Sequence, residues 1–123
     1  MSNFENEVIR LVNEYRQENG KAPLMHNPSL QRSARVRAEE IAEKFSHTRP
    51  NGSTCFTAIT IRYSTAGENI AMGHRSPEAV IRGWIKSDGH RKNLLNDSFN
   101  AIGVGCYEEG GVIHWAQMFV KTR

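Results

Sequence analysis

The sequence is poor in cysteine and contains no long apolar run. It has two cysteines among 123 residues, and a chain of this length buries enough surface to form a core without disulfide or metal staples. No apolar stretch approaches the length of a membrane-spanning helix, so we expect no membrane span. With 38% hydrophobic and 24% charged residues, the composition is that of an ordinary soluble globule. We therefore expect a single domain over residues 1–123.

Charge of one sign and nucleophile motifs are also scarce. The net charge is only +3, the basic residues are spread along the chain, and we expect no nucleic-acid partner. There is no Gly-x-Ser-x-Gly elbow and no Walker loop, and Cys55 lacks the flanking residues of a protease nucleophile. A signal peptide is not visible either, because the first helical pattern begins near Phe4. The protein is therefore either cytosolic or the mature domain of a longer exported precursor.

The two cysteines, Cys55 and Cys106, allow two interpretations. A disulfide would close a loop of about 50 residues and contribute about 4 kcal/mol on the chain-entropy model. An exported location would favour this bond. Alternatively, Cys106 is a small buried apolar residue in a strand. The sequence leaves both interpretations open.

Apolar periodicity predicts helices over residues 4–19 and 28–46, with Phe45 on the buried stripe of the second. Asn27 and Pro28 form a helix start, and so do Ser76 and Pro77. The helix beginning at Pro77 should end near residue 87 and be followed by a turn at residues 88–89 and a short helical turn over 90–95. The composition of residues 54–63 favours a strand.

The C-terminal third predicts a hairpin. Residues 101–107 and 112–121 should be strands joined by the turn 108–111, and residues 66–72 a further extended segment. The last strand is apolar on both faces, which indicates cover on both sides. Gly103 and Gly105 share one strand face and would let a helix approach closely. We therefore expect an α/β fold, a three-layer α/β/α sandwich with a small, mainly antiparallel central sheet.

Two histidines and one glutamate are the main candidates for a functional site. His47, Glu68 and His90 lie roughly 20 residues apart, so only a tertiary fold can bring them together. Imidazole and carboxylate are the groups that bind divalent metals or transfer protons near neutral pH.

The segments around these residues resemble one family along nearly the whole chain. They are Val12-Asn13-Glu14-Tyr15-Arg16, Gly20, Pro23-Leu24, Leu30, Ala34, His47, Pro50-Asn51-Gly52, Gly67-Glu68-Asn69-Ile70-Ala71, Trp84, Ser87-x-Gly89-His90-Arg91-x-Asn93-Leu94-Leu95, Gly103-Val104-Gly105 and Trp115-x-Gln117-x-Phe119. In this order they resemble the CAP superfamily of cysteine-rich secretory, antigen 5 and pathogenesis-related proteins, or SCP domain, with its bacterial branch the closer match. The resemblance implies the same sandwich fold and, within residues 54–63, a short helix followed by a loop.

The resemblance also implies an open cleft with two histidines and two glutamates, which binds a divalent metal in some members. His47 matches the first histidine, Glu68 the glutamate of the Gly-Glu-Asn motif, and His90 the histidine of the Gly-His motif. The fourth group departs from the eukaryotic pattern, because Ser87 stands at the glutamate position and Asp88 is the nearest carboxylate. We expect a cleft of His47, Glu68, His90 and Asp88, with a divalent metal such as zinc as a cofactor on His47, His90 and Glu68.

Each of these residues also has a simpler explanation. His47 could be a cation at a helix C-terminus, Glu68 could hold a loop through backbone N–H groups, and His90 could pack under Trp84.

The function that we expect is a binding protein and not an enzyme. It would be secreted or held in the cell envelope, monomeric, and would bind a divalent metal or a small ligand such as a lipid, sterol or envelope glycan. The alternatives are a protease-like hydrolase that uses the His/Glu cleft, and an envelope scaffold with a vestigial cleft.

Overall fold

The computed structural model describes residues 2–123. Its elements, in chain order, are α1 (Ser2–Glu18), β1 (Met25–His26), α2 (Pro28–Glu43), the 3-10 helix η1 (Cys55–Ala58), β2 (Tyr63–Met72), α3 (Pro77–Lys86), α4 (Asp88–Leu94), β3 (Ala101–Glu109) and β4 (Val112–Thr122). None of the helices in residues 2–123 combines the length and apolar character that crossing a bilayer requires.

The four strands form one sheet in the order β1-β3-β4-β2. β4 lies at its centre and pairs antiparallel with both β3 and β2, whereas the two-residue β1 pairs parallel with β3. The sheet is therefore mixed, although antiparallel pairing dominates as predicted. β2 is an edge strand, and the candidate site lies beside it.

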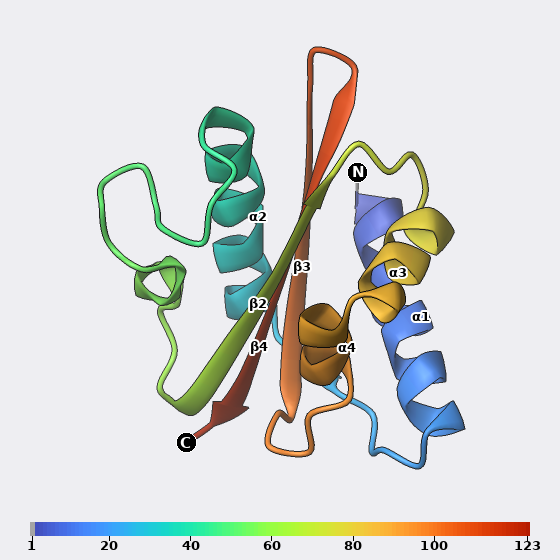
Figure 1. Cartoon of the computed structure of the whole chain (residues 1–123). Coiled ribbons are helices and arrows are strands. Elements are labelled where there is room, and N and C mark those ends of the chain that lie inside the picture. The colour runs from blue at the N-terminus through green and yellow to red at the C-terminus, as the bar shows by residue number, and fades with distance from the viewer. Residues whose placement is uncertain (1) are drawn as a thin grey trace.

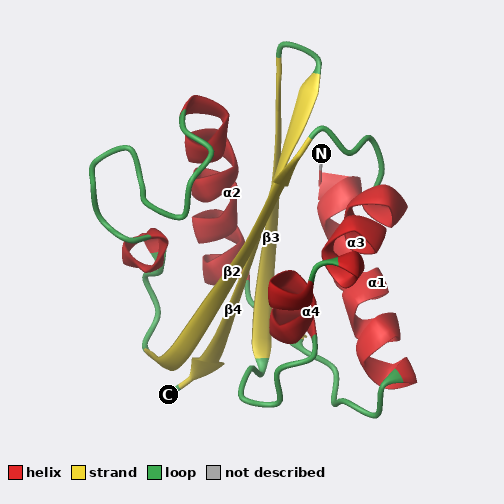
Figure 2. Cartoon of the chain, viewed as in Figure 1, coloured by secondary structure: helices red, strands yellow, loops and turns green. Residues whose placement is uncertain are grey.

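Helices cover both faces of this sheet. In Figures 1 and 2, α2 lies on one side, and α1, α3 and α4 lie on the other. The α/β/α sandwich predicted from the sequence is confirmed. Helix α2 lies very close to β3. A Cβ added to Gly103 or Gly105 would be only 2.4 Å from backbone atoms of α2. The two glycines thus permit the close approach that their shared strand face predicted.

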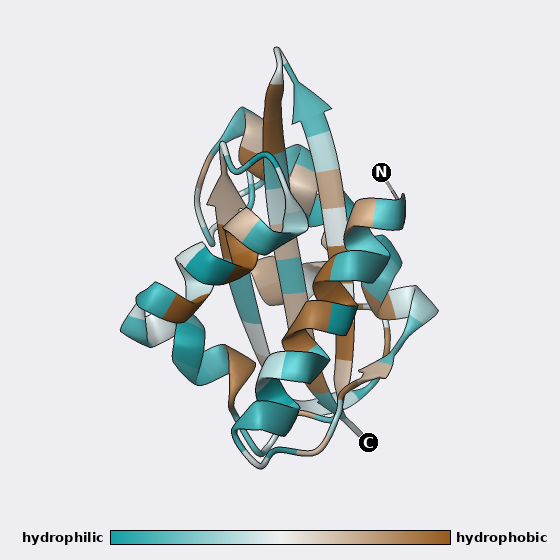
Figure 3. Ribbon diagram, turned by 90° about the vertical axis from the view of Figure 1, so that its right-hand side faces the viewer, coloured by the Kyte–Doolittle hydropathy of each residue, from teal (hydrophilic) through white to brown (hydrophobic). Residues whose placement is uncertain are grey.

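The opposite face carries the larger hydrophobic cluster. It joins Val8 and Val12 of α1 to Trp84 of α3 and to Trp115 and Phe119 of β4. Figure 3 looks onto this layer and shows hydrophobic turns of the helices next to hydrophilic ones. The two faces of β4 are both buried, as its apolar pattern indicated.

The two predicted helix N-caps are confirmed, whereas the predicted end of one helix and start of another are wrong. Asn27 accepts from the Leu30 N–H at 2.9 Å, and Ser76 accepts from the Ala79 N–H at 3.1 Å. However, α2 ends at Glu43, three residues early, and Phe45 is half-exposed in the segment that follows.

The turn expected at residues 88–89 is the other error, because Asp88 begins α4. Within residues 54–63, η1 occupies 55–58 and a loop follows until β2 begins at Tyr63. The short helix and loop implied by the resemblance are confirmed, and the strand favoured by the composition is wrong. The hairpin turn is shorter than predicted and consists of Gly110 and Gly111, with φ of 60° and 79°. Such positive φ values at both positions suit a two-residue turn between twisted strands.

Both cysteines are free and buried. Cys106 belongs to the hydrophobic cluster on the α1 side of the sheet. Cys55 lies in η1, which packs on α2 on the other side. The sheet separates the two thiols, so the disulfide considered from the sequence is not formed.

Candidate functional site

His47 lies in the loop after α2, outside any helix. The chain becomes extended at Lys44, with φ of −144° and ψ of 109°. The idea that His47 is a helix C-terminal cation is therefore wrong. Its side chain is 58% exposed, and its Nδ1 lies 2.8 Å from Oε1 of Glu68. The imidazole is thus held at one nitrogen and open at the other.

Glu68 occupies the middle of β2 and points toward the α2 layer. Its side chain is only 1% exposed, so its charge requires partners. Oε2 accepts from Arg37 Nε at 2.7 Å, and Oε1 accepts from Arg37 Nη2 at 3.2 Å as well as from His47. The partners of the Glu68 carboxylate are therefore side chains and not the loop backbone N–H groups that the simpler explanation required.

Arg37 is the residue that the sequence analysis missed. It lies in α2 with no exposed surface, three residues after Ala34 and four before Ile41. The sequence did contain a signal, an arginine on the buried stripe of a predicted helix. A buried charge needs a charged partner, so such an arginine indicates an ion pair in the interior.

A second carboxylate, Glu40, extends the charged network outward. It accepts from Arg37 Nη1 at 2.8 Å and from Arg49 Nη2 at 2.8 Å. Burial would raise the pKa of Glu40, but hydrogen bonds from Arg49 and Arg37 hold that pKa below its usual range. Burial alone would likewise lower the pKa of Arg37, and its bonds to Glu68 and Glu40 instead raise it. Both groups stay charged.

His90 lies in α4, on the opposite side of the sheet from α2. Its pKa is lowered from 6.5, first by burial and second by the nearby charge of His47. Amides hold its backbone: Asn69 Nδ2 donates to the His90 carbonyl at 3.2 Å, and Asn93 Nδ2 donates to Asn69 Oδ1 at 2.9 Å. Asn69, which follows Glu68 in β2, thus holds the helix α4 that carries His90.

Asp88 is not brought into this group. Its side chain is 81% exposed and forms an ion pair with Arg91. Asp88 therefore does not replace the missing second glutamate in this arrangement.

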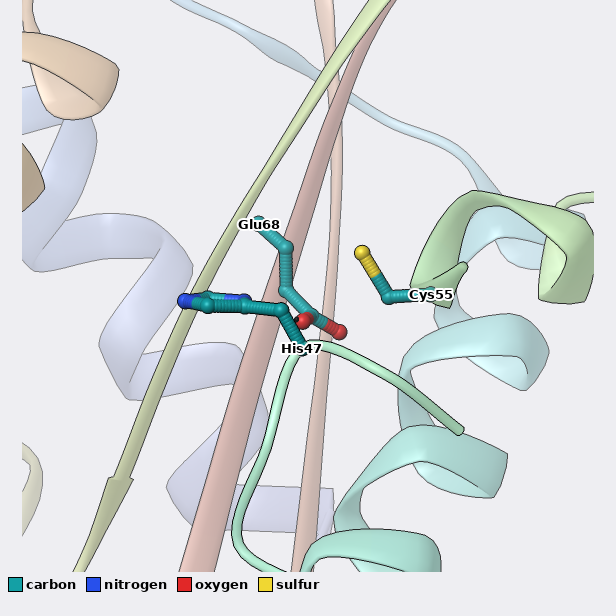
Figure 4. Close-up of side chains that lie close together, drawn as sticks. All are labelled: His47, Cys55 and Glu68. Atoms are coloured by element: carbon teal, nitrogen blue, oxygen red, sulfur yellow. Dashed lines mark hydrogen bonds and ion pairs between the residues drawn. The ribbon is translucent and has the colours of Figure 1, made fainter. Parts of the chain in front are cut away.

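A pocket of about 460 Å³ opens beside His47 and Glu68. Its lining is His47, Thr48, Thr54, Cys55, Phe56, Ala66, Gly67, Glu68 and Asn93. Figure 4 shows the Cys55 thiol and the His47 ring on either side of the Glu68 carboxylate. Burial and then the Glu68 charge raise the pKa of Cys55 to about 12. The thiol is therefore a poor nucleophile at neutral pH.

Two sets of donors could hold a metal ion. One ligand atom each of His47, Cys55 and Glu68 lies within 4.8 Å of the others. In this set the thiol is protonated, and Glu68 already shares both oxygens with Arg37. The other set would combine the free Nε2 of His47 with the imidazole of His90, whose pKa is lowered by burial and then by the nearby charge of His47. Neutral imidazole is a good zinc ligand, so the histidine pair fits a metal better.

Comparisons with known proteins agree with this fold. The model of the cysteine-rich secretory protein family, CAP, matches residues 9–119. The uncharacterized protein YkwD of Bacillus subtilis is 41% identical over 125 residues, which cover 98% of this chain and 48% of YkwD.

Two solved structures are similar. An extracellular protein of Bacillus anthracis that contains an SCP domain superposes with a TM-score of 0.90 at 28% identity, over 98% of this chain and 41% of that protein. NaASP2, crystallised with Zn²⁺, gives a TM-score of 0.72 at 11% identity over 100% of this chain and 82% of NaASP2, a likeness of fold alone.

The chain spans about half the length, or less, of the two Bacillus relatives. Its match to the family model covers nearly all of its own residues. The protein therefore belongs to the cysteine-rich secretory protein (CAP) family.

Proposed function

We propose that this domain is an extracellular or envelope-associated binding module whose cleft holds a divalent metal on His47 and His90. A small ligand, such as a lipid, sterol or envelope glycan, would be bound in the adjoining pocket or through the metal. Zinc suits two imidazoles, and an open coordination position would accept an oxygen of the ligand.

The hydrogen bond between His47 and Glu68 is the observation that carries this proposal. An ionised carboxylate can only accept, so Nδ1 of His47 must carry the proton at this 2.8 Å contact. The lone pair then lies on Nε2, which points away from Glu68 in Figure 4. Carboxylate partners orient metal-binding histidines in this way in many proteins. Glu68 therefore supports the site by orienting His47, and direct coordination by Glu68 is the less favoured arrangement.

The pocket supplies the place for a ligand. Thr48 and Thr54 contribute hydroxyl groups, whereas Phe56 and Ala66 contribute apolar surface. Such a mixed wall suits a small amphipathic molecule better than a highly charged one.

Relatives support the proposed location. The Bacillus anthracis structure is described as that of an extracellular protein. For this chain, secretion or attachment to the envelope remains part of the proposal.

Titration calorimetry with ZnCl₂ tests the proposal. The wild type should bind near neutral pH, and His47→Ala and His90→Ala should each weaken binding strongly. His26→Ala is the matched control, because His26 lies in β1 at the opposite edge of the sheet from β2. Absence of zinc binding in the wild type, or equal binding by both cleft variants, would leave the scaffold as the better explanation.

A hydrolase remains the alternative function. It would need a general base within reach of the substrate, and both oxygens of Glu68 already accept hydrogen bonds from Arg37. Zinc-dependent turnover of a peptide, ester or glycan substrate by the wild type, lost in His47→Ala, would favour the hydrolase over the binding module.

A further inference from the structure

We infer that Arg37 is the positioning residue of the cleft: it sets the orientation and the proton position of His47 through Glu68 and Ser46. This inference rests on the proposed function only in taking His47 as a ligand.

The Arg37 guanidinium donates hydrogen bonds to two groups that hold His47, the Glu68 carboxylate and the Ser46 carbonyl. Nε and Nη2 donate to the two Glu68 oxygens at 2.7 and 3.2 Å. Nη2 also donates to the Ser46 carbonyl at 2.6 Å, on the residue just before His47. The same planar group therefore holds the carboxylate that contacts the ring and the backbone that carries the ring.

Arg49 secures the chain on the other side of His47. It donates to both oxygens of Glu40 through Nε, each at 3.0 Å, and to Thr57 Oγ1 at 2.9 Å. Glu40 in turn accepts from Arg37. The loop around His47 is thus tied to α2 at Ser46 and at Arg49, although it lies between the helices α2 and η1.

The charges of this network balance without a contribution from His47. Arg37 and Arg49 carry two positive charges, and Glu40 and Glu68 carry two negative ones. Buried ion pairs of this kind contribute little net stability, because desolvation offsets the attraction. What they do supply is defined geometry, since the planar guanidinium fork matches the carboxylate at two points.

The fixed orientation of the Glu68 carboxylate favours one tautomer of His47. Arg37 prevents Glu68 from rotating away, so Oε1 always faces Nδ1 and the proton stays there. Without Arg37, a side chain that is 58% exposed would sample other orientations and both tautomers. The lone pair on Nε2 would then face the cleft only part of the time.

The tautomer of His47 can be measured directly by long-range ¹H–¹⁵N correlation NMR at about pH 8, where free imidazole is neutral. The wild type should show the proton on Nδ1 alone. Glu68→Gln should invert the tautomer, because Arg37 can only donate and its shorter bond, from Nε at 2.7 Å, holds the amide oxygen at the Oε2 position, on the side away from His47. The amide NH₂ then faces His47 and donates to Nδ1, which leaves the proton on Nε2.

Arg37→Lys tests the positioning residue itself. Lysine keeps the charge but offers no planar fork, so it cannot hold both Glu68 oxygens and Ser46 in one geometry. We expect a mixture of His47 tautomers. Arg35→Lys is the matched control, because Arg35 also leaves α2 to donate through Nε and Nη2 to a buried carboxylate, Glu5, and neither residue contacts the cleft. Arg35→Lys should keep the wild-type tautomer.

Zinc affinity provides the second readout. Loss of an orienting partner of this kind weakens metal binding by roughly 10–100-fold. We expect this loss in Glu68→Gln and Arg37→Lys, and none in Arg35→Lys. If the wild type binds no zinc while the tautomers change as described, the proposed metal site fails and the positioning role of Arg37 stands.

Three results would overturn the inference. The first is a wild-type His47 with its proton on Nε2. The second is a folded Arg37→Lys protein with the wild-type tautomer. The third, decisive if Arg37→Lys does not fold, is a Glu68→Gln protein in which Nδ1 keeps the proton.

Discussion

The hydrogen bonds around Glu68 determine what this side chain can do chemically. Glu68 lies in a cleft beside two histidines, a setting that suggests acid–base work. Yet both of its oxygens accept from Arg37, and one accepts from His47 as well. A carboxylate with all of these hydrogen bonds serves to hold its neighbours in place.

His90 should give the domain a pH-dependent stability. Its pKa in the folded protein lies below the ordinary value of 6.5. The unfolded chain therefore binds more protons as the pH falls below 6.5, and the native state is progressively destabilised over that range. Urea unfolding of the wild type and of His90→Gln, measured between about pH 7 and 5, should show a smaller loss for the variant. Equal losses would mean that the His90 imidazole is solvated like a free one.

Gly105 should tolerate no side chain. A Cβ there would lie 2.4 Å from the Ala34 carbonyl oxygen and the Arg35 amide nitrogen, both backbone atoms of α2. Gly105→Ala must therefore push α2 off the sheet, and we expect a loss of about 1–3 kcal/mol in the free energy of unfolding.

Gly89→Ala is the matched control for this substitution. A Cβ on Gly89 would have no atom within 4 Å, and alanine is the better helix former in α4 by up to about 1 kcal/mol. Urea denaturation should place the two variants on opposite sides of the wild type. If Gly105→Ala is as stable as the wild type, α2 does not approach β3 this closely.

Sequence patterns predicted helix starts correctly where a nearby side chain stabilises the start. Asn27 with Pro28, and Ser76 with Pro77, mark helix starts because a side-chain oxygen meets a free N–H three residues on. The end of α2 had no such signal. Arg37 draws the Ser46 carbonyl to itself, a tertiary contact that no local pattern contains, and the predicted helix was three residues too long.

Trp84 illustrates a local pattern that extends to packing. Its spacing from Val80 and Ile81 predicts a place on the buried stripe of its helix. It is almost fully buried, and its Nε1 donates to the Ile70 carbonyl of β2 at 3.2 Å. Trp84→Ala should destabilise the domain by about 3–5 kcal/mol, through the cavity and the unpaired carbonyl. Thermal and urea unfolding would measure this loss. A loss below about 1 kcal/mol would contradict the anchoring role of α3 against β2.

The candidate site draws its residues from three layers of the fold, around the edge strand β2. His47 comes from the segment that follows α2, Glu68 from the sheet, and His90 from α4 on the opposite face. Spacing along the chain could say only that a tertiary fold must unite them. Their identity as a group came from the resemblance to a family, whereas Arg37 lies outside the motifs that carry that resemblance and emerged only from the contacts.

The same layered arrangement determines the state of the cysteines. Cys55 packs on the α2 side of the sheet and Cys106 on the α1 side, so no local movement can join them. Burial is also the first cause that raises the pKa of each thiol to about 12. Thiol titration without reductant should therefore be slow for the native protein, because the thiolate is the reactive form. After denaturation it should rapidly yield both thiols, and adding reductant should not shift the unfolding midpoint. Recovery of no free thiol from protein kept away from oxidants would show a disulfide, and with it a different path for η1 or β3.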